Sequence, residues 1–438
     1  MKINWFAPLP PAKTGVADYL MAILPELAAR ADVTLWTDQK KWDPALAREV
    51  HVRTYHTKQM PWEELNRADL NVYNLGNNHL FHGSIWQVAR RQPGAVVLHD
   101  LRLNDFFYNL YLDHFDDAPG FVAHMEKYYG QEGRRAAEMC LINGPVVDLA
   151  QSYPLTALAL ENSLGVVVHT REAQQELTPA NRWLVAYAPL PFSPLPPSPV
   201  TVKKPARDDQ PYRLIIFGFI SRNRQVKELL EALAAFSQKK RFVLDIYGDV
   251  WDAGEVHQQI RSLGLTENVR LRGFTSQASL DSALASADLA INLRFPTMGE
   301  ASISQLRIWA HSLPSIVTSV GWYGELPETA VAHVRPGHEV ADIQAHLNAF
   351  LSDPARFQSM GQEGHRMLEA HKPDDYVETV LNLANQALLF RPRAAAYGLA
   401  DRVGMLMSAW ADVLSSDQAL RKAAEEILTL TNGPTASS

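Results

Sequence analysis

Short apolar runs alternate along the chain with longer segments whose apolar residues recur at helical spacing. Between residues 17 and 30, for example, Leu20, Ile23, Leu24 and Leu27 fall on one face of a predicted helix. The runs that predict strands are 3–6, 33–36, 69–74, 95–99 and 165–169, then 213–218, 242–248, 269–273, 289–293 and 315–318. Strands that alternate with helices are typical of parallel sheets covered by helices, so the pattern predicts an α/β fold.

A proline-rich break separates the two series of strands. Residues 189–199 have the sequence PLPFSPLPPSP, which suits neither a helix nor a central strand. The pattern therefore predicts two doubly wound domains, at residues 1–195 and 205–375. In such sheets ligands bind at the carboxyl ends of the strands, where the strand order reverses.

The remaining region, 376–438, carries an apolar stripe at helical spacing. The stripe consists of Leu399, Val403, Leu406, Met407, Trp410, Val413 and Leu414. It favours helices that pack back on the body of the protein or form an oligomer contact. A peripheral membrane contact is the alternative, although the polar face has little positive charge, with Arg402 between Asp401 and Asp412.

Composition narrows the classes of protein that fit. The chain has 438 residues, 47% hydrophobic and 20% charged, a balance typical of globular proteins with two or three domains. A net charge of -7 argues against a general nucleic-acid binder. The single cysteine, Cys140, cannot form an internal disulfide, and no uncharged stretch approaches the ~20 residues of a transmembrane helix. We expect a cytoplasmic protein, with contact at the inner face of the membrane left open.

The order of several motifs resembles a known family. The second half contains LDIYGD, LGLTENVRLRGF, ASADLAINLR and GEASISQLRIWAHSLPSIVTSVGWYGELPE, and the first contains PLPPAKTGVADYLMAILPELA, YNLGNNHLFH and VVLHD. Together they resemble the retaining GT-B glycosyltransferases (glycosyltransferase family 4, group 1). The resemblance implies two Rossmann-like domains facing an interdomain cleft. It also implies transfer of a sugar, with retention, from a nucleotide-sugar to a carbohydrate or lipid-linked acceptor, without a metal or other cofactor.

A basic loop follows the first strand of the second half. Beyond Gly218 it carries Arg222, Arg224 and Lys227, before or within the first turn of a predicted helix. Helix N-termini and guanidinium groups both favour phosphate, so the loop is predicted to bind a diphosphate. In the family an arginine directly follows the glycine, where Phe219 stands here. We therefore take Arg224 as the main ligand, with Arg222 or Lys227 replacing the missing arginine; a solvated basic loop is the alternative.

The segment PTMGEAS is the second candidate for the donor side. Glu300 leads through Ala301 and Ser302 into a predicted helix, where a carboxylate beside free N–H groups can orient sugar hydroxyls. The family has two glutamates here, for the donor sugar and the ribose. Glu300 matches the first with an offset of one residue, and Arg307 stands at the second, where it can pair with a phosphate or a carboxylate. Glu325 is a further candidate for sugar or ribose contact.

The first half offers candidates for both substrates. His99 ends a predicted strand and is expected to hydrogen-bond a sugar hydroxyl or to move a proton; a structural cap is the alternative. Gly15 lies in a strand–helix turn where bare N–H groups can approach the donor. The acceptor-side candidates are Asp18, Tyr19, Asn78 and His79, the last two of which equally suit a polar turn.

Two other functions stay open at this point. One is a sugar phosphorylase or nucleotide-sugar epimerase on the same fold, and the other is a nucleotide- or glycan-binding protein that has lost catalysis. Arg307 favours the binding protein, whereas Gly15, His99, Arg224 and Glu300 favour the transferase.

Overall fold

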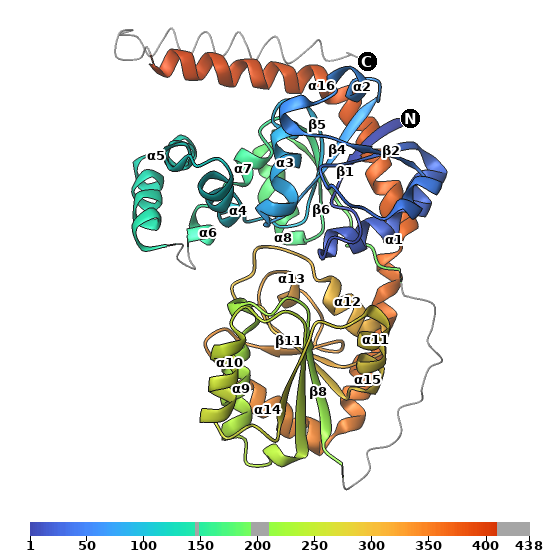
Figure 1. Ribbon diagram of the computed structural model, residues 1–438, viewed down its shortest axis with the longest axis vertical. Coiled ribbons are helices and arrows are strands. Elements are labelled where there is room, and N and C mark those ends of the chain that lie inside the picture. Colours follow the sequence, from blue (N-terminus) through green and yellow to red (C-terminus); the bar gives the residue numbers. More distant parts are fainter. Residues whose placement is uncertain (145–148, 194–209, 410–438) are drawn as a thin grey trace, which may run out of the picture. The chain divides into compact units, whose positions relative to one another are not determined.

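The computed structural model describes residues 1–144, 149–193 and 210–409 (Figure 1). The chain separates into two compact units. The first unit consists of Met1–Ala188 and Tyr376–Ser438, and the second unit consists of Pro189–Asp375. The first unit is therefore discontinuous in sequence, and the region after residue 375 belongs to it.

The first unit is built on a parallel sheet of seven strands in the order β3-β2-β1-β4-β5-β6-β7. The strands are β1 (Lys2–Phe6), β2 (Asp32–Thr37), β3 (His51–Thr54), β4 (Leu70–Leu75), β5 (Gly94–Leu98), β6 (Ser163–Val168) and β7 (Leu184–Tyr187). All neighbouring strands are parallel, and the central ones are almost wholly buried. The strand order reverses between β1 and β4, which is where a ligand site is expected.

Helices flank this sheet. They are α1 (Gly15–Arg30), α2 (Trp62–Leu65), α3 (His79–Ala89), α4 (Asn104–Asn109), α5 (Ala118–Asn143), α6 (Leu149–Ser152), α7 (Thr156–Ala159), α8 (Arg171–Leu177) and α16 (Pro373–Ala409). Helix α1 begins at Gly15, two residues before the predicted start, because the side chain of Thr14 accepts a hydrogen bond from Val16 N and caps it. Helices α4 to α7 form a separate helical subdomain beside the sheet (Figure 1).

The second unit contains a parallel sheet of six strands in the order β10-β9-β8-β11-β12-β13. The strands are β8 (Tyr212–Phe217), β9 (Phe242–Tyr247), β10 (Val269–Gly273), β11 (Leu289–Asn292), β12 (Ser315–Thr318) and β13 (Ala332–Val334). The helices are α9 (Val226–Ala235), α10 (Ala253–Ser262), α11 (Gln277–Ser286), α12 (Ile303–Ala310), α13 (Gly321–Gly324), α14 (Glu339–Ser352) and α15 (Pro354–Met367). Here the strand order reverses between β8 and β11.

The predicted α/β architecture is confirmed, and all ten predicted strands are present with ends shifted by at most two residues. Three strands were not predicted: β3, β7 and β13. Each is the outermost strand of its sheet. Edge strands are covered on fewer sides, and polar residues interrupt the apolar run in β3 (HVRT) and β13 (AHV), whereas β7 (LVAY) is apolar but only half-buried.

The first turns of α16 pack into the first unit. Tyr376, Val377, Val380 and Leu383 are buried there. Of the predicted apolar stripe, Leu399 is exposed and Val403 is half-buried; the other five side chains lie outside those described. Among the described residues, no helix combines the length and the hydropathy that a membrane span requires.

Candidate functional site

Arg224 lies at the point of the second unit where the strand order reverses. Its Nη1 donates to Asn292 Oδ1 at 2.8 Å and its Nη2 donates to Phe217 O at 3.1 Å. Phe217 ends β8 and Asn292 ends β11, so one guanidinium joins the two strands. Burial, followed by the nearby charge of Arg294, lowers the pKa of Arg224 to about 10, and the group stays protonated at neutral pH.

A chain of buried amides holds this arginine in place. Asn292 Nδ2 donates to Gln305 Oε1 at 2.9 Å, and Gln305 Nε2 donates to Ser315 Oγ at 2.7 Å. The same Gln305 donates its backbone N–H to Ser302 Oγ at 3.1 Å, so Ser302 is the N-cap of α12. The chain links Arg224 to the start of α12.

Glu300 is held by two hydrogen bonds and an ion pair. Its Oε2 accepts from Thr297 Oγ1 at 2.8 Å and from Met298 N at 2.7 Å. Its Oε1 lies 3.1 Å from Arg294 Nε, and the exposed fractions of the two side chains are 22% for Arg294 and 15% for Glu300. Because both groups are largely shielded from water, the ion pair is screened less than a surface pair.

Arg294 was missed by the sequence analysis. It lies two residues beyond the end of β11, and its backbone N–H donates to Thr318 Oγ1 of β12 at 3.0 Å. Its Nη1 donates to Asn223 Oδ1 at 3.5 Å, next to Arg224 in the chain, and its charge contributes to the lowered pKa of Arg224. A cation directly beyond a predicted strand was the available signal.

Tyr323 completes the group. It is wholly buried in α13, it is an electrostatic neighbour of Arg224, and its hydroxyl makes no hydrogen bond within the described residues. The Nε of Arg224 is also buried without a hydrogen bond there. We call Arg224, Arg294, Glu300 and Tyr323 the Arg224 cluster. It holds two cations and one carboxylate, so the cluster favours an anion.

Two glycines bring the ends of β8 and β9 close together. Gly218 has φ +108° and Gly248 has φ +122°, values that side-chain-bearing residues rarely adopt. A Cβ atom at Gly248 would lie 1.9 Å from Gly218 O. Gly218 is exposed, and Phe219 beside it is 62% exposed.

The other predicted residues of the basic loop and the PTMGEAS segment differ in burial. Arg222 and Lys227 are exposed, whereas Arg224 is 2% exposed. Ala301 is half-buried beside Glu300, and Glu325 is exposed at the end of α13. Of the residues predicted to bind the donor, Arg224 and Glu300 belong to the Arg224 cluster.

Arg307 is engaged elsewhere. Its Nε and Nη2 lie 3.0 Å and 2.8 Å from Asp281 Oδ1, and His311 Nε2 lies 3.2 Å from the same atom. Asp281 is on α11, and within the described residues no hydrogen bond or ion pair joins Arg307 to the Arg224 cluster. Arg307 follows the inward-facing Gln305 by two residues, about 200° around the helix, so it projects from the opposite face.

In the first unit, His99 follows β5 and is half-buried. Its Nε2 lies 3.0 Å from Asn74 Oδ1. Asn74 Nδ2 donates to Phe6 O at 2.9 Å, which fixes the orientation of the amide, so His99 Nε2 carries a proton and donates it. Burial and the neighbouring His169 hold the pKa of His99 well below its usual value. The ring is therefore neutral at neutral pH, and its Nδ1 is an acceptor.

Tyr19 packs against His99 instead of facing solvent. Its ring centroid lies 5.0 Å from that of His99, and its hydroxyl lies 2.9 Å from the hydroxyl of Tyr376 on α16. His169 stacks near both tyrosines, and its Nδ1 lies 3.1 Å from Ala188 O. We call Tyr19, His99, His169 and Tyr376 the tyrosine–histidine cluster. The 1% exposure of Tyr19 means that its hydroxyl cannot reach an acceptor in this conformation.

The remaining predicted residues of this unit lie at helix starts. Gly15 and Asp18 are exposed in the first turn of α1. Asn78 is the N-cap of α3 and accepts from Leu80 N at 3.0 Å. His79 Nε2 lies 3.6 Å from a carboxylate oxygen of Asp113. The polar turn, given above as the alternative for Asn78, accounts for its contact.

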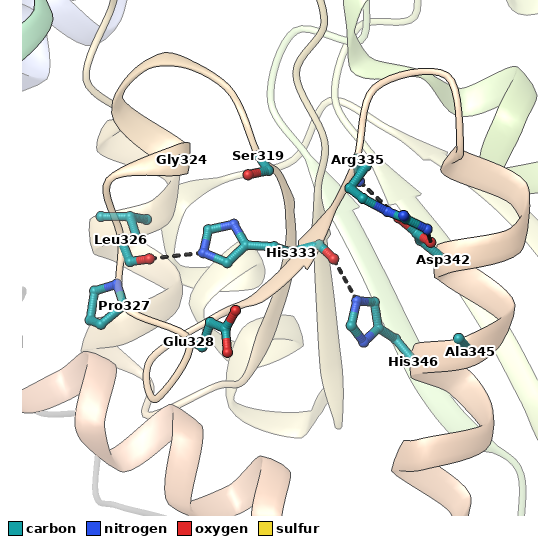
Figure 2. Close-up of a pocket in the computed structure, with 10 residues that line it drawn as sticks. All are labelled: Ser319, Gly324, Leu326, Pro327, Glu328, His333, Arg335, Asp342, Ala345 and His346. Carbon is teal, nitrogen blue, oxygen red and sulfur yellow. Dashed lines mark hydrogen bonds and ion pairs between the residues drawn. The ribbon is translucent and has the colours of Figure 1, made fainter.

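A separate pocket of about 530 Å³ lies beside β13 in the second unit. Figure 2 shows the residues that line it: Ser319, Gly324, Leu326, Pro327, Glu328, His333, Arg335, Asp342, Ala345 and His346. His333 Nε2 lies 2.8 Å from Leu326 O, and Arg335 pairs with Asp342 at 2.7 Å (Figure 2). No predicted site residue lines this pocket. Within the described residues, no group of three or more His, Cys, Asp or Glu is arranged to hold a metal ion.

The sequence of the second unit matches a known family. Residues 199–367 match the model of glycosyl transferases group 1. This match confirms the resemblance for the second unit. No curated protein matches the chain.

Solved structures are similar over most of the chain. HepE of Anabaena, in complex with UDP, has a TM-score of 0.60 and 17% identity, covering 87% of this chain and 99% of that one. Sucrose-phosphate synthase from Thermosynechococcus elongatus has a TM-score of 0.60 and 16% identity, with 88% and 98% covered. WaaG, a glycosyltransferase involved in lipopolysaccharide biosynthesis, has a TM-score of 0.57 and 14% identity, with 87% and 99% covered. These similarities confirm the predicted GT-B fold.

Proposed function

Residues 199–367 are a domain of the glycosyl transferases group 1, and on this premise we propose that the protein transfers a sugar from a nucleotide-sugar donor. The acceptor is a glycan, a lipid-linked sugar or a small molecule, and the anomeric configuration is retained. One observation carries the proposal: the Arg224 cluster concentrates positive charge where the strand order of the second unit reverses.

The chemistry requires such charge. As the bond between the sugar and the diphosphate breaks, negative charge grows on the leaving phosphate oxygen, and fixed cations stabilise that charge. Arg224 is protonated at neutral pH and held by hydrogen bonds to two strand ends. Because it is already oriented, it needs no reorganisation during the reaction. We propose that this arginine replaces a metal ion as the main charge partner of the diphosphate.

Glu300 is the proposed ligand of the donor sugar. Two hydrogen bonds and an ion pair hold its carboxylate, and the carboxylate oxygens have lone pairs left to accept from sugar hydroxyls. A fixed carboxylate limits the orientations of the bound sugar and so favours the reactive one. In the retaining reaction the leaving phosphate oxygen takes the acceptor proton on the same face of the sugar.

His99 is the proposed contact of the first unit with a sugar hydroxyl. Its Nε2–H is used by Asn74, whereas Nδ1 of the neutral ring is an acceptor. A neutral acceptor suits a hydroxyl group and gives no attraction to a second anion. Asp18, exposed at the start of α1, remains a proposed acceptor-side residue, with Asn78 and His79 at the start of α3.

Calorimetric titration tests the proposal. UDP and GDP are each titrated into the protein, with magnesium and with EDTA. UDP is the first probe because the structurally similar HepE has been solved with it. We expect one nucleotide to bind equally well in both buffers. Binding of neither would contradict the proposal, and binding only with magnesium would contradict its metal-independent form.

Turnover assays separate the transferase from the other enzyme classes. With the nucleotide that binds, the corresponding nucleotide-sugars are supplied with and without an acceptor mixture. A transferase releases nucleotide slowly without acceptor and faster with it. A phosphorylase would require inorganic phosphate, and an epimerase would convert the sugar with no acceptor at all.

A further inference from the structure

We propose that Arg294 is a second diphosphate ligand and makes the donor site specific for diphosphates, with Glu300 as its partner in the free enzyme. The inference rests on the proposed function and adds to it a residue outside the basic loop. Arg294 comes from the end of β11, whereas Arg224 follows β8. These are the two strands between which the order of the sheet reverses.

The first step is position. Arg294 Nη1 donates to Asn223 Oδ1 at 3.5 Å, and Phe295 N donates to Asn223 O at 2.8 Å, so the segment around Arg294 contacts the residue that precedes Arg224. The backbone N–H of Arg294 is fixed to Thr318 Oγ1, which anchors the residue between β11 and β12. Its side chain is 22% exposed, so a ligand can reach it, whereas Arg224 is 2% exposed. The exposed cations of the loop, Arg222 and Lys227, have no such anchoring within the described residues.

The second step is charge. Arg224 and Arg294 repel each other, and Glu300 is the carboxylate that offsets this repulsion in the cluster. A diphosphate brings two or more negative charges, so it can pair directly with Arg294 while the buried charge of Arg224 also attracts it. A nucleoside brings none. The cluster therefore discriminates by charge, and the gain from Arg294 appears only when the ligand is anionic.

The third step is competition. Glu300 Oε1 lies 3.1 Å from Arg294 Nε, so the carboxylate and an incoming phosphate attract the same guanidinium. Loss of the carboxylate charge then leaves Arg294 more available to the nucleotide. The two partners of one ion pair are thus expected to have opposite effects on nucleotide binding. A purely structural ion pair would give the same sign for both.

The experiment measures two affinities for each variant. The probes are the nucleoside diphosphate that binds the wild type (UDP or GDP), by calorimetry, and its nucleoside (uridine or guanosine), by ligand-observed NMR. The variants are Arg294→Gln, Arg294→Lys and Glu300→Gln. Arg335→Ala is the matched control, because it removes another arginine–carboxylate pair of the same unit, beside β13 (Figure 2).

We expect Arg294→Gln to weaken nucleoside diphosphate binding at least ~10-fold and to leave nucleoside binding within ~2-fold, as for loss of a charge-assisted contact. Arg294→Lys should recover most of the affinity, and Glu300→Gln should bind the diphosphate as tightly as the wild type or tighter. The Arg335→Ala control should be unchanged.

Three results would overturn the inference: unchanged diphosphate binding in Arg294→Gln, equal losses for diphosphate and nucleoside, or weaker diphosphate binding in Glu300→Gln. Each of these requires a wild type that binds. If the wild type binds neither UDP nor GDP, the proposed function itself fails, and the two failures are thereby distinguished.

Discussion

The two units carry opposite chemistry at equivalent points of similar sheets. In each, the strand order reverses next to the first strand of the unit, between β1 and β4 and between β8 and β11. The first unit places the tyrosine–histidine cluster near this point, and His99 and Tyr19 in it are neutral, since burial lowers the pKa of His99 and raises that of Tyr19. The second unit places charged groups there. The sheet topology decides where a site lies, and the side chains decide which ligand it accepts.

The two units also differ in the contacts that hold these side chains and in the charge that the side chains carry. In the second unit, Arg224 is oriented by Asn292 and by a backbone carbonyl, and its charge survives burial because its pKa stays near 10. In the first unit the contacts are ring packing and a hydroxyl pair between Tyr19 and Tyr376. We therefore expect the second unit to stabilise an anion and the first unit to stabilise it little.

The largest expected effect is that of Arg224→Ala. Turnover should fall at least ~100-fold, because the fixed charge that faces the leaving group is lost. The free energy of unfolding should also fall by about 1–3 kcal/mol, because Asn292 Oδ1 and Phe217 O lose their donor. Steady-state kinetics and urea unfolding measure the two. The control is Arg261→Ala, which removes an exposed arginine of α10. Wild-type turnover in Arg224→Ala would contradict the proposal that the charge of Arg224 contributes to catalysis.

Glu300→Gln is expected to lower kcat ~100-fold while the unfolding free energy changes little. Glutamine keeps the shape of the side chain but accepts more weakly from sugar hydroxyls and no longer carries charge. Glu328→Gln, an exposed glutamate of the same unit, is the matched control. An unchanged kcat in Glu300→Gln, with Glu328→Gln also unchanged, would place the donor sugar elsewhere.

The buried histidines of the first unit predict that the free energy of unfolding depends on pH. Burial lowers the pKa of His82 to about 4, and that of His99 also falls below its usual value. Each histidine then binds a proton in the unfolded chain before it does so in the folded one. Stability is therefore complete above about pH 6.5 and falls as the pH decreases toward 4, by about 1.4 kcal/mol per pH unit for each such histidine.

Urea unfolding between pH 7.5 and 4.5 measures this slope. His82→Gln should reduce the slope, whereas His51→Gln, on the exposed end of β3, should leave it as in the wild type. The comparison of slopes is independent of any constant loss of stability that the substitution causes. A slope in His82→Gln equal to that of the wild type would contradict the neutral, buried state of this histidine.

The smallest expected effect concerns the hydroxyl pair. Tyr376→Phe leaves the Tyr19 hydroxyl buried without its partner, which should cost about 1–2 kcal/mol of unfolding free energy. Adding Tyr19→Phe removes the orphaned group, so the double variant should be no less stable than the single one. Urea unfolding of Tyr376→Phe, Tyr19→Phe and the double variant gives the coupling free energy between the two hydroxyls. Additive losses would show that the two hydroxyls act independently.

The strands of both sheets could be predicted because buried strands are nearly all apolar, and the missed strands are edges. The places of Arg224 and Glu300 near a strand end and a helix start could be predicted, because such junctions lie at the ligand-binding side of a sheet. That these two residues bind the donor stays a prediction. The side of α12 on which Arg307 lies follows from its spacing of two residues from Gln305, once Gln305 is known to face inward. The structure shows that orientation, whereas the sequence does not.

The other members of the two clusters could not be predicted from the sequence, for a different reason. The site contributions of Tyr323 and Tyr376 depend on partners far away in the chain; Tyr19 and Tyr376 are separated by 357 positions. No local period or spacing encodes such a pair. The same holds for the ion pair of Arg307 with Asp281, 26 residues apart on different helices.

The discontinuity of the first unit has a consequence during protein synthesis. The ribosome makes the chain from the N-terminus, so all of the second unit, Pro189–Asp375, is synthesised before Tyr376, the residue that covers Tyr19. Until Tyr376 and Leu383 follow, the nascent first unit lacks the ring against Tyr19 and the side chain that contacts Gly165 of β6. The part of the chain made first is therefore the last to be completed, and a translation product ending before residue 376 would expose an unfinished apolar surface to chaperones.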